Sequence, residues 1–295
     1  METLVTLSKI DRLDRYTKND VDGLLFGGPL SLRFNYSLSE INTINEYCLK
    51  EGLKRYIALD AFISENDKAV VNDYFSFLKN LDVDGIYFTD LGIINVASSF
   101  KMGDKLIYDP DTLLTNSLDI NFFLRQGIGT VLARELSLDE VKRILTNNPG
   151  KCDMQVFGHL KMSYSKRHFM TNYFNYLGVE KDILGKRNIT LVEENRNYRL
   201  PILEDEYGTR IYSDYIFLMY KEFVDLKPLL KRAIIDDTFI EDTNLIFAIL
   251  RDVKRVSDVN AVFLEEIILS KYDNYQFSNG YLSNKTSKVK EDDNE

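Results

Sequence analysis

The chain has few of the residues that build disulfide frameworks and metal sites. Its 295 residues include two cysteines, two histidines and no tryptophan. Because Cys48 and Cys152 lie far apart and in no metal-ligand spacing, neither a disulfide framework nor a thiolate cluster is supported. His159 and His168 alone cannot assemble a zinc site of several histidines, so we expect no metal site in this chain.

Long apolar runs are also absent. No segment approaches the roughly 18 consecutive apolar residues that a membrane span requires. The N-terminus lacks the cationic stretch and long apolar run of a secretion signal. We therefore expect no membrane partner and a cytoplasmic location, where a reducing environment fits the low cysteine content.

Positive charge is scarce overall but locally concentrated. The formal net charge of −9 argues against broad, sequence-independent binding of nucleic acid, which depends on many Lys and Arg side chains. Between Lys161 and Arg199, however, eight Lys and Arg residues outnumber four Asp and Glu residues. This local basic patch is either a binding surface or a solvated loop surface.

The apolar residues are numerous enough for a folded core, and their pattern indicates a parallel sheet. Apolar residues make up 44% of the chain. Short apolar runs rich in β-formers alternate with amphipathic helical stretches, as in repeated βα units. The eight candidate strands begin at Leu4, Gly23, Tyr56, Gly85, Lys105, Thr130, Cys152 and Arg232. Eight units in 295 residues predict an α/β fold of the TIM-type (β/α)8 barrel class, as one domain over residues 1–276.

Two capping boxes mark helix starts. Ser37 with Glu40 and Ser137 with Glu140 have the spacing at which the two residues cap each other's backbone amides. After each box, or between strands, apolar residues recur at helical spacing and should face the barrel core. These are Ile41, Ile44, Tyr47, Cys48, Val70, Val71, Tyr74, Phe77 and Leu78.

The regular alternation stops after residue 174. Residues 185–213 read as short strands and turns, with turn chemistry at 195–197 and at Tyr207 with Gly208. We predict a small β-rich insertion there, before the last barrel strand. Residues 277–295 are polar and mixed in charge, so we expect a disordered tail.

Charged residues gather at the predicted carboxyl ends of the strands, where β/α barrels place their functional groups. Taken singly, each carboxylate is explained by helix capping or a loop hydrogen bond; as a set they predict a site. Arg134 is a candidate clamp for a substrate carboxylate or phosphate, or the structural partner of Glu135. The strand-end residues are Asp60, Asp90, Asp109, Arg134, Glu135, Asp236 and Asp237.

From these we select candidate roles. Arg134, Glu135 and Asp237 are the candidate catalytic residues, and Asp90 and Asp109 are candidates for substrate binding. The basic segment SYSKR lies between His159 and His168. These two histidines could titrate near neutral pH, or else they are ordinary loop histidines. The candidate substrate-binding residues in and beside this segment are Lys161, Lys166, Arg167 and His168.

Three blocks, LARELSLDEV, MQVFGHLKMSYSKRHFMTNYF and PILEDEYGTRIYS, resemble the collagenase-like peptidase family of unknown catalytic type, peptidase family U number thirty-two. Their order and spacing match that family over residues 23–237. The resemblance implies a TIM-type barrel with an inserted β-rich segment. It also implies functions that range from a collagenase-like peptidase to tRNA wobble-uridine, ribosomal RNA and ubiquinone hydroxylation.

The chain departs from the family in its cysteines. Several such relatives hold an iron–sulfur cluster through four cysteines, and here the first two positions are Lys161 and His168. Residues 178–190 contain no Cys, and Phe157 replaces a usual His. Since such clusters need thiolate ligands, the resemblance predicts no iron–sulfur cluster and no other cofactor in this chain. Ser165, Lys166 and Arg167 resemble the shorter of two paired relatives that form 5-hydroxyuridine in tRNA.

Three functions follow from the resemblance. The first is a subunit or paralogue in tRNA wobble-uridine 5-hydroxylation, working with a longer cysteine-containing paralogue. Arg134, Lys166 and Arg167 would then bind a small carboxylate donor or the tRNA backbone, and tRNA contact would be local and salt-dependent. The second is a collagenase-like peptidase, although the sequence has no zinc motif or nucleophile elbow. The third is a non-catalytic barrel scaffold for the cysteine-bearing partner.

Overall fold

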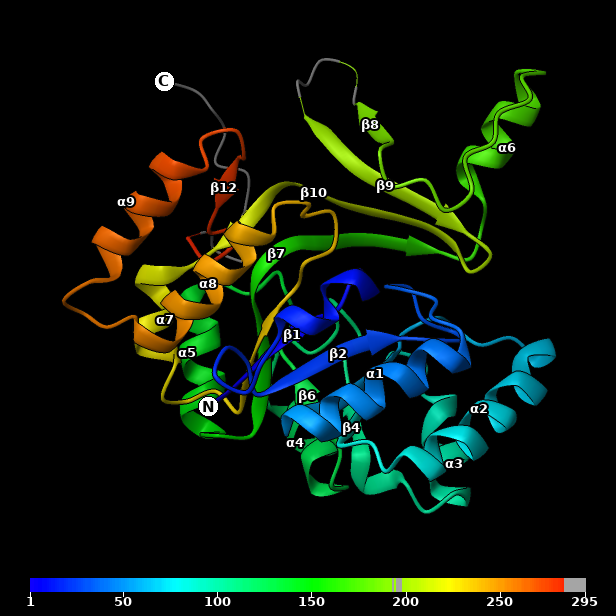
Figure 1. Ribbon diagram of the computed structural model, residues 1–295, viewed down its shortest axis with the longest axis horizontal. Coiled ribbons are helices and arrows are strands. Elements are labelled where there is room, and N and C mark those ends of the chain that lie inside the picture. The colour runs from blue at the N-terminus through cyan, green and yellow to red at the C-terminus, as the bar shows by residue number, and fades with distance from the viewer. Residues whose placement is uncertain (193, 195–197, 284–295) are drawn as a thin grey trace.

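The computed structural model describes residues 1–192, 194 and 198–283, and eight parallel strands form a closed barrel at its centre (Figure 1). Neighbours pair in chain order from β1 to β7, and β11 pairs with both β7 and β1, which closes the ring. The predicted TIM-type barrel and its eight strands are confirmed. The strands are β1 (Glu2–Thr6), β2 (Gly23–Gly27), β3 (Lys54–Leu59), β4 (Gly85–Phe88), β5 (Leu106–Tyr108), β6 (Gly129–Val131), β7 (Cys152–Ser165) and β11 (Arg232–Ile235).

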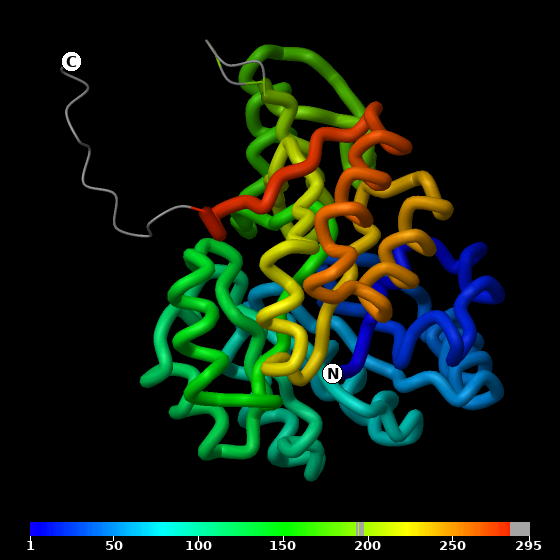
Figure 2. The backbone as a smooth tube through the Cα atoms, turned by 90° about the vertical axis from the view of Figure 1, so that its left-hand side faces the viewer, coloured from blue at the N-terminus to red at the C-terminus, as the bar shows by residue number. Residues whose placement is uncertain are grey.

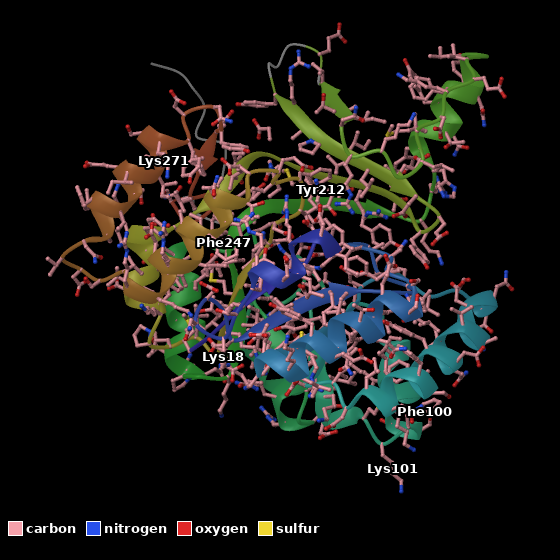
Figure 3. All side chains as sticks on the ribbon, viewed as in Figure 1. Lys18, Phe100, Lys101, Tyr212, Phe247 and Lys271 are labelled. Atoms are coloured by element: carbon pink, nitrogen blue, oxygen red, sulfur yellow. The ribbon has the colours of Figure 1, made fainter. Side chains whose placement is uncertain are left out.

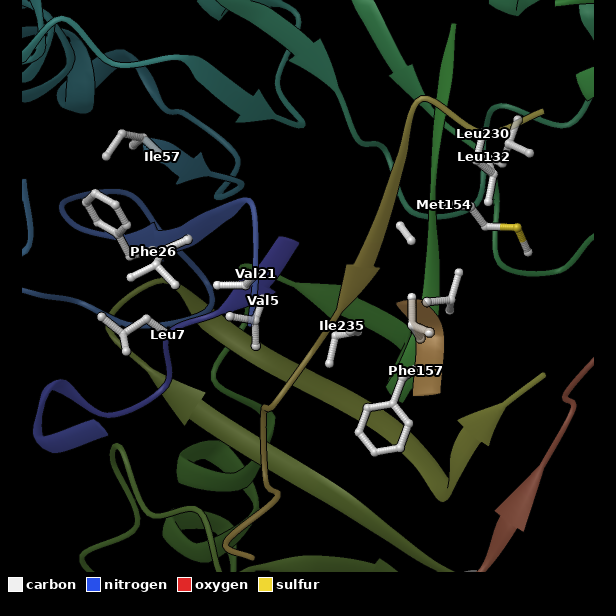
Figure 4. Packing of buried hydrophobic residues seen from close by; sticks show 14 of the residues in the cluster. Val5, Leu7, Val21, Phe26, Ile57, Leu132, Met154, Phe157, Leu230 and Ile235 are labelled. Atoms are coloured by element: carbon white, nitrogen blue, oxygen red, sulfur yellow. The ribbon is translucent and has the colours of Figure 1, made fainter. Parts of the chain in front are cut away.

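Alternation along the strands divides the core into two parts, because successive side chains point to opposite faces. Leu4 lies inside the barrel, whereas its neighbour Val5 packs outward against the helices. Figure 4 shows part of this outer layer, including Val5, Phe26 and Ile57. The inner core is small and consists of Leu4, Leu25, Tyr56, Ala58, Tyr87, Ile107, Val131 and Ile234.

Helices cover the outside of the barrel. Both predicted capping boxes are formed, at Ser37 with Glu40 and at Ser137 with Glu140. The predicted inward faces are mostly right, but Val70 is wrong: it is 46% exposed, and its neighbour Val71 turns inward instead. The helices are α1 (Leu38–Glu51), α2 (Lys68–Leu81), α3 (Gly92–Ser99), α4 (Ser117–Arg125), α5 (Leu138–Asn147), α6 (Phe169–Tyr176), α7 (Tyr220–Leu226), α8 (Thr243–Arg255) and α9 (Ala261–Lys271), with short 3-10 helices at Ile10–Arg15, Glu65–Asp67 and Gly103–Lys105.

Among the described residues, none of these helices combines the length and the apolar character needed to cross a bilayer.

An ion pair closes the barrel interior at the amino ends of the strands. Arg232 Nη1 lies 2.7 Å from Asp153 Oδ2, and the hydroxyl of Tyr87 donates to the same oxygen at 2.8 Å. Burial raises the pKa of Asp153, against the influence of Arg232. This layer fills the end of the barrel that β/α enzymes use for stability, and leaves the opposite end for function.

An insertion between β7 and β11 forms an arm, which we define as the described residues of 162–218. Strand β7 runs past the barrel to Ser165 and pairs antiparallel with β10 (Gly208–Leu218), which pairs in turn with β9 (Arg199–Asp205) and then β8 (Thr190–Val192). The segment 185–213 therefore contains β8, β9 and most of β10. At the turn, Gly208 has a φ of +118°, and a Cβ there would lie 2.1 Å from the Ser165 carbonyl oxygen. The expected turn at 195–197 lies outside the described residues.

The C-terminal segment does not begin with a disordered tail. Strand β12 (Phe277–Ser278) pairs with β10, and Leu282 is buried. The Leu282 carbonyl accepts a hydrogen bond from the Leu138 amide at 3.0 Å. Figure 2 shows this red segment reaching from the α9 region to the green part of the chain. The prediction of disorder is thus wrong for residues 277–283, because backbone pairing with β10 outweighs their polar composition; residues 284–295 lie outside the described part.

Candidate functional site

One buried guanidinium joins three strand ends at the mouth of the barrel. Arg33 lies in the loop after β2 and is 7% exposed. Its Nη1 lies 2.6 Å from Asp236 Oδ2, after β11. Its Nε and Nη2 each lie 3.2 Å from a further carboxylate oxygen, of Asp60 after β3 and Asp109 after β5. Charge-assisted bonds of this kind are strong and directional, so Arg33 fixes the relative positions of these strand ends.

Two further cations extend this arrangement. Arg134 Nη2 lies 3.3 Å from Asp109 Oδ2, its Nη1 pairs with Asp111, and its Nε donates to Gln155 Oε1 at 2.8 Å. Lys161 Nζ lies 2.8 Å from Asp111 Oδ2. We call the whole set the mouth network: Arg33, Arg134 and Lys161 with Asp60, Asp109, Asp111 and Asp236.

Asp60, Asp109 and Lys161 of the mouth network are held in their charged forms. Burial opposes ionisation of Asp60, but Lys161 and Arg33 outweigh it and lower its pKa. The pKa of Asp109 is lowered in the same way by Arg134 and Arg33. For Lys161, burial favours the neutral amine, but Asp111 and Asp60 raise its pKa. These charges therefore compensate one another and persist at neutral pH.

The space within the mouth network is narrow, and a wider cleft opens beside it. The inner cavity has a volume of about 10 Å³, room for about one water molecule. Tyr212, labelled in Figure 3, lines it together with residues of the network. The adjoining space, which we call the mouth cleft, has a volume of about 130 Å³. Its lining residues are Phe62, Thr89, Pro110, Asp111, Thr112, Lys161, Met162, Ser163 and Tyr164.

The mouth cleft has an aromatic wall and a polar edge. The rings of Phe62 and Tyr164 stack with centroids 4.7 Å apart and planes at 26°. The ammonium of Lys161 lies 5.9 Å from the centre of the Tyr164 ring. Asp111 and Lys161 belong to both the cleft and the mouth network. A flat, partly polar ligand would therefore find both stacking and hydrogen-bonding partners here.

The arm contributes a second guanidinium to the mouth. Arg187 Nη2 donates to the backbone carbonyl of Arg33 at 2.8 Å. The guanidinium carbon lies 4.4 Å from the ring centre of Phe34 and 5.9 Å from that of Phe239. No carboxylate of the described residues forms a salt bridge with Arg187, and burial lowers its pKa. Its remaining N–H donors are thus available to an anion.

A neutral histidine and a phenylalanine with a left-handed backbone conformation complete this side of the mouth. His159 Nδ1 lies 2.8 Å from the Ser213 carbonyl oxygen, an acceptor, so Nδ1 carries the proton. Burial lowers the pKa of His159, so the ring is neutral at pH 7. Phe239 has a φ of +65° and packs edge-on against both His159 and Tyr212. Such backbone conformations in bulky residues concentrate at functional sites.

The three predicted catalytic residues lie apart from one another in the structure. Arg134 joins the mouth network, but all its nitrogens bond to protein groups, so it forms neither the substrate clamp nor the pair with Glu135. Glu135 is exposed and lies outside the network. Asp237 turns away from the mouth: its Oδ2 accepts from Ser8 Oγ at 2.6 Å and from Arg12 Nη1 at 3.1 Å.

Of the predicted substrate-binding residues, only Asp109 and Lys161 join the mouth network. Asp90 accepts from the Ile63 and Gly92 amides and so shapes two loops. Lys166 bonds to the Phe62 carbonyl and to Asp67, while Arg167 is exposed. His168 Nε2 lies 2.9 Å from the Asp205 carbonyl oxygen, within the arm.

The site residues that were not predicted from the sequence include the polar residues Arg33, Asp111, Gln155 and Arg187 and the aromatic residues Phe62, Tyr212 and Phe239. Arg33 and Asp111 lie in the loops after β2 and β5, beyond the last strand residue. Extending the search from strand ends to the loops that follow them could have found both. Arg187 carries no local signal, because the arm brings it to Arg33 across 154 residues of sequence.

The residues present do not fit an iron–sulfur cluster. Lys161, at one ligand position of the family, presents an ammonium that pairs with Asp111. Both cysteines are buried elsewhere, and burial raises the pKa of Cys48 to about 12 and that of Cys152 to about 11. Neither thiol is a ready thiolate ligand. Within the described residues, no group of three or more His, Cys, Asp and Glu side chains is arranged so that it could hold a metal ion.

Comparison with known proteins gives the chain its family. The tRNA hydroxylation proteins P2 and P1 of Bacillus subtilis (strain 168) are 33% identical over 188 residues and 24% identical over 177 residues. These matches cover 62% and 58% of this chain and 61% and 42% of the relatives, so the chain spans less than two thirds of their lengths. A collagenase of Porphyromonas gingivalis is 23% identical over 148 residues, 48% of this chain and 35% of its own.

The fold agrees with this relationship. A solved structure of a U32 peptidase superposes with a TM-score of 0.50 at 16% sequence identity, covering 80% of this chain and 92% of that chain. The family model described as Peptidase family U32 matches residues 8–236, which include the barrel strands from β2 to β11 and the whole arm. This chain therefore belongs to peptidase family U32.

Proposed function

We propose that this chain acts in the hydroxylation of a tRNA wobble uridine, as the shorter of two paralogues. The relative named tRNA hydroxylation protein P2 supports this, since it shares 33% identity over 188 residues. The structural observation that carries the proposal is the mouth cleft. It combines stacked aromatic rings with charged groups held in fixed positions by the mouth network.

The mouth cleft suits a uracil base turned out of its strand. Enzymes that modify a base commonly extrude it, stack it against aromatic side chains and read its polar edge by hydrogen bonds. In the cleft, Phe62 and Tyr164 supply the aromatic wall. Lys161 supplies N–H donors for the uracil carbonyl oxygens, and Asp111 supplies acceptors for its N–H. The single-stranded anticodon loop is the part of a tRNA that offers such a base.

The hydroxylation itself needs a co-reactant. Replacing the C5 hydrogen of uracil with a hydroxyl group removes two electrons from the base. The side chains of the mouth offer charge, hydrogen bonds and stacking, which position a substrate but accept no electrons. With water as the source of the hydroxyl oxygen, the reaction releases two protons and two electrons. We assign the two-electron acceptor to the longer, cysteine-containing paralogue, and the existence of two related proteins named P1 and P2 supports such a pair.

Arg187 is the proposed binding residue for a small carboxylate co-substrate of the reaction. Arg134, the residue first considered for this role, has its nitrogens engaged by Asp109, Asp111 and Gln155. Arg187 instead bonds to one backbone carbonyl and is held between aromatic rings. A planar guanidinium with free donors matches a carboxylate in a bidentate arrangement.

The test combines genetics and chemistry, and it starts from a host strain that carries the intact gene. The gene is deleted, and 5-hydroxyuridine and its derivatives in bulk tRNA are quantified by liquid chromatography and mass spectrometry. We expect these nucleosides to fall on deletion and to return with the wild-type gene and with Phe263→Ala, an exposed aromatic residue on α9. Tyr164→Ala should fail to restore them.

Two results would overturn the proposal. Unchanged levels of these nucleosides, in a deletion strain without redundant relatives, would rule out a role in tRNA hydroxylation. If Tyr164→Ala restores the nucleosides to the wild-type level, the mouth cleft is not the uridine site. A catalytically silent scaffold would be indicated if the nucleosides fall on deletion but are restored by every mouth variant that still binds the longer paralogue.

A further inference from the structure

The helix of the arm carries an aromatic stripe that faces solvent. Phe169, Tyr173 and Tyr176 are spaced i, i+4 and i+7 on α6, so they lie on one face. They are 46%, 58% and 87% exposed. Figure 1 shows α6 standing away from the barrel, on the side toward which the arrowheads of β2 and β7 point. Three exposed rings in a row exceed what scattered surface residues explain.

The stripe is held in place by contacts on the other side of α6. Met170 packs with Ile183 and Ile202 in a small core of the arm, and Phe174 packs against it. The buried carboxylate of Glu204 accepts hydrogen bonds from the Met170 amide at 2.8 Å and the Thr171 amide at 3.0 Å. The outward rings are therefore presented by an anchored helix, and their exposure does not result from a missing core.

The arm is less acidic than the chain as a whole, since residues 162–218 contain eight Lys and Arg and eight Asp and Glu. Residues 162–199 contain seven Lys and Arg against four Asp and Glu, in a chain with a net charge of −9. Arg167, two residues before Phe169, is exposed and has no salt bridge within the described residues. The Lys181 ammonium lies 4.8 Å from the centre of the Phe174 ring, on the same helix. Phe174 itself packs against the core of the arm, so Lys181 lies beside α6 but not on the aromatic stripe. A single-strand binding surface combines such cations with exposed rings.

We infer that the arm binds a single-stranded RNA loop, with unpaired bases stacked on Tyr173 and Tyr176 and phosphates near Arg167 and Lys181. This inference rests on the proposed function and adds a second contact, separate from the mouth cleft, for the same RNA. Unpaired bases expose ring faces that stack on aromatic side chains, whereas bases in a duplex do not. The exposed Arg167 and the nearby Lys181 favour a phosphate-bearing ligand over an apolar protein surface.

The experiment measures binding of the full chain to RNA. The probes are a fluorescent hairpin with the anticodon-loop sequence and the same sequence closed into a duplex, each titrated at two salt concentrations. Tyr173→Ala with Tyr176→Ala should weaken hairpin binding by at least about 30-fold, the lower end of the range for loss of two base stacks. Phe263→Ala, which removes an equally exposed ring from α9, should bind as the wild type does. Arg167→Gln should weaken binding and lower its salt dependence.

The outcomes separate this inference from the proposed function. Equal hairpin affinity of the double variant and the wild type would overturn the inference, as would equal binding of hairpin and duplex. Loss of association with the cysteine-containing paralogue at unchanged RNA affinity would also overturn it, because α6 would then contact protein. If gene deletion lowers 5-hydroxyuridine but the double variant restores it fully, the inference fails and the proposed function stands. If deletion changes nothing, the proposed function fails whatever the arm binds.

Discussion

Asp236 and Asp237 are adjacent in sequence, yet their carboxylates belong to different sites. Asp236 accepts from Arg33 in the mouth network, whereas Asp237 accepts from Ser8 and Arg12 on the other side of the strand end. Alternation at the end of β11 produces this division. Asp236 therefore helps to shape the candidate site, whereas Asp237 affects the stability of the fold.

The first prediction concerns Asp237 and pH. Burial raises the pKa of Asp237 to about 7, against the influence of Ser8. Between about pH 4 and 7 the native state then binds more protons than the unfolded chain, so its free energy of unfolding falls as pH rises. Asp237→Asn removes this dependence. The wild-type free energy of unfolding should fall relative to that of the variant by about 2 kcal/mol from pH 5 to pH 7.

Urea unfolding across this pH range measures the difference. Asp14→Asn, at an exposed carboxylate near Arg12, serves as the control and should track the wild type at each pH. A constant difference between Asp237→Asn and the wild type would show that Asp237 is ionised throughout, with Arg12 outweighing burial.

The second prediction concerns Arg33. Arg33→Met should lower the free energy of unfolding by about 3 to 5 kcal/mol at pH 7, because buried carboxylates lose a shared cation. In the wild type the pKa values of Asp60 and Asp109 are lowered, so their stabilisation is present at neutral pH and is lost as pH falls through those values. The cost of Arg33→Met should accordingly shrink in acid. If the free energy of unfolding falls by less than about 1 kcal/mol at pH 7 in the same urea assay, Arg134 and Lys161 are sufficient to neutralise the buried carboxylates.

The third prediction separates binding from stability at Arg187. Arg187→Met keeps an apolar side chain between Phe34 and Phe239 and removes a buried cation that has no carboxylate partner. The midpoint of thermal unfolding should therefore change little, while 5-hydroxyuridine in tRNA falls at least about tenfold, a change worth about 1.4 kcal/mol of transition-state binding. Arg187→Lys, which keeps the charge but not the planar fork, should give an intermediate level. A parallel loss of stability and modification would assign Arg187 to folding alone.

The barrel could be predicted from sequence because its signals are local. Each strand shows its apolar run and each capping box its own spacing, so the eight strands and two helix starts were identified within windows of a few residues. The mouth network joins residues such as Arg33 and Asp236, 203 positions apart, and no window contains both. Strand β12 shows the same limit, since its two residues are ordered by the edge of β10 rather than by their own composition.

The last prediction tests whether Glu204 anchors the arm helix. Its carboxylate accepts from the Met170 and Thr171 amides and from two threonine hydroxyls, at the amino end of α6. A carboxamide has a single acceptor oxygen, so Glu204→Gln leaves one of the two first-turn amides without its acceptor. Amide hydrogen exchange across α6 should accelerate by about 5- to 100-fold, the range for loss of a bond to a buried charged group, while exchange in β3 stays unchanged.

A matched control comes from the other capped helix. Glu140→Gln weakens the capping box of α5, so it should accelerate exchange in α5 and leave α6 as it is. If Glu204→Gln leaves α6 exchange unaltered, the small core around Met170 alone holds the helix. If α6 does loosen, the aromatic stripe is still present but less ordered. RNA binding should then weaken less than on removal of Tyr173 and Tyr176, because the stacking rings remain and only the cost of ordering them rises.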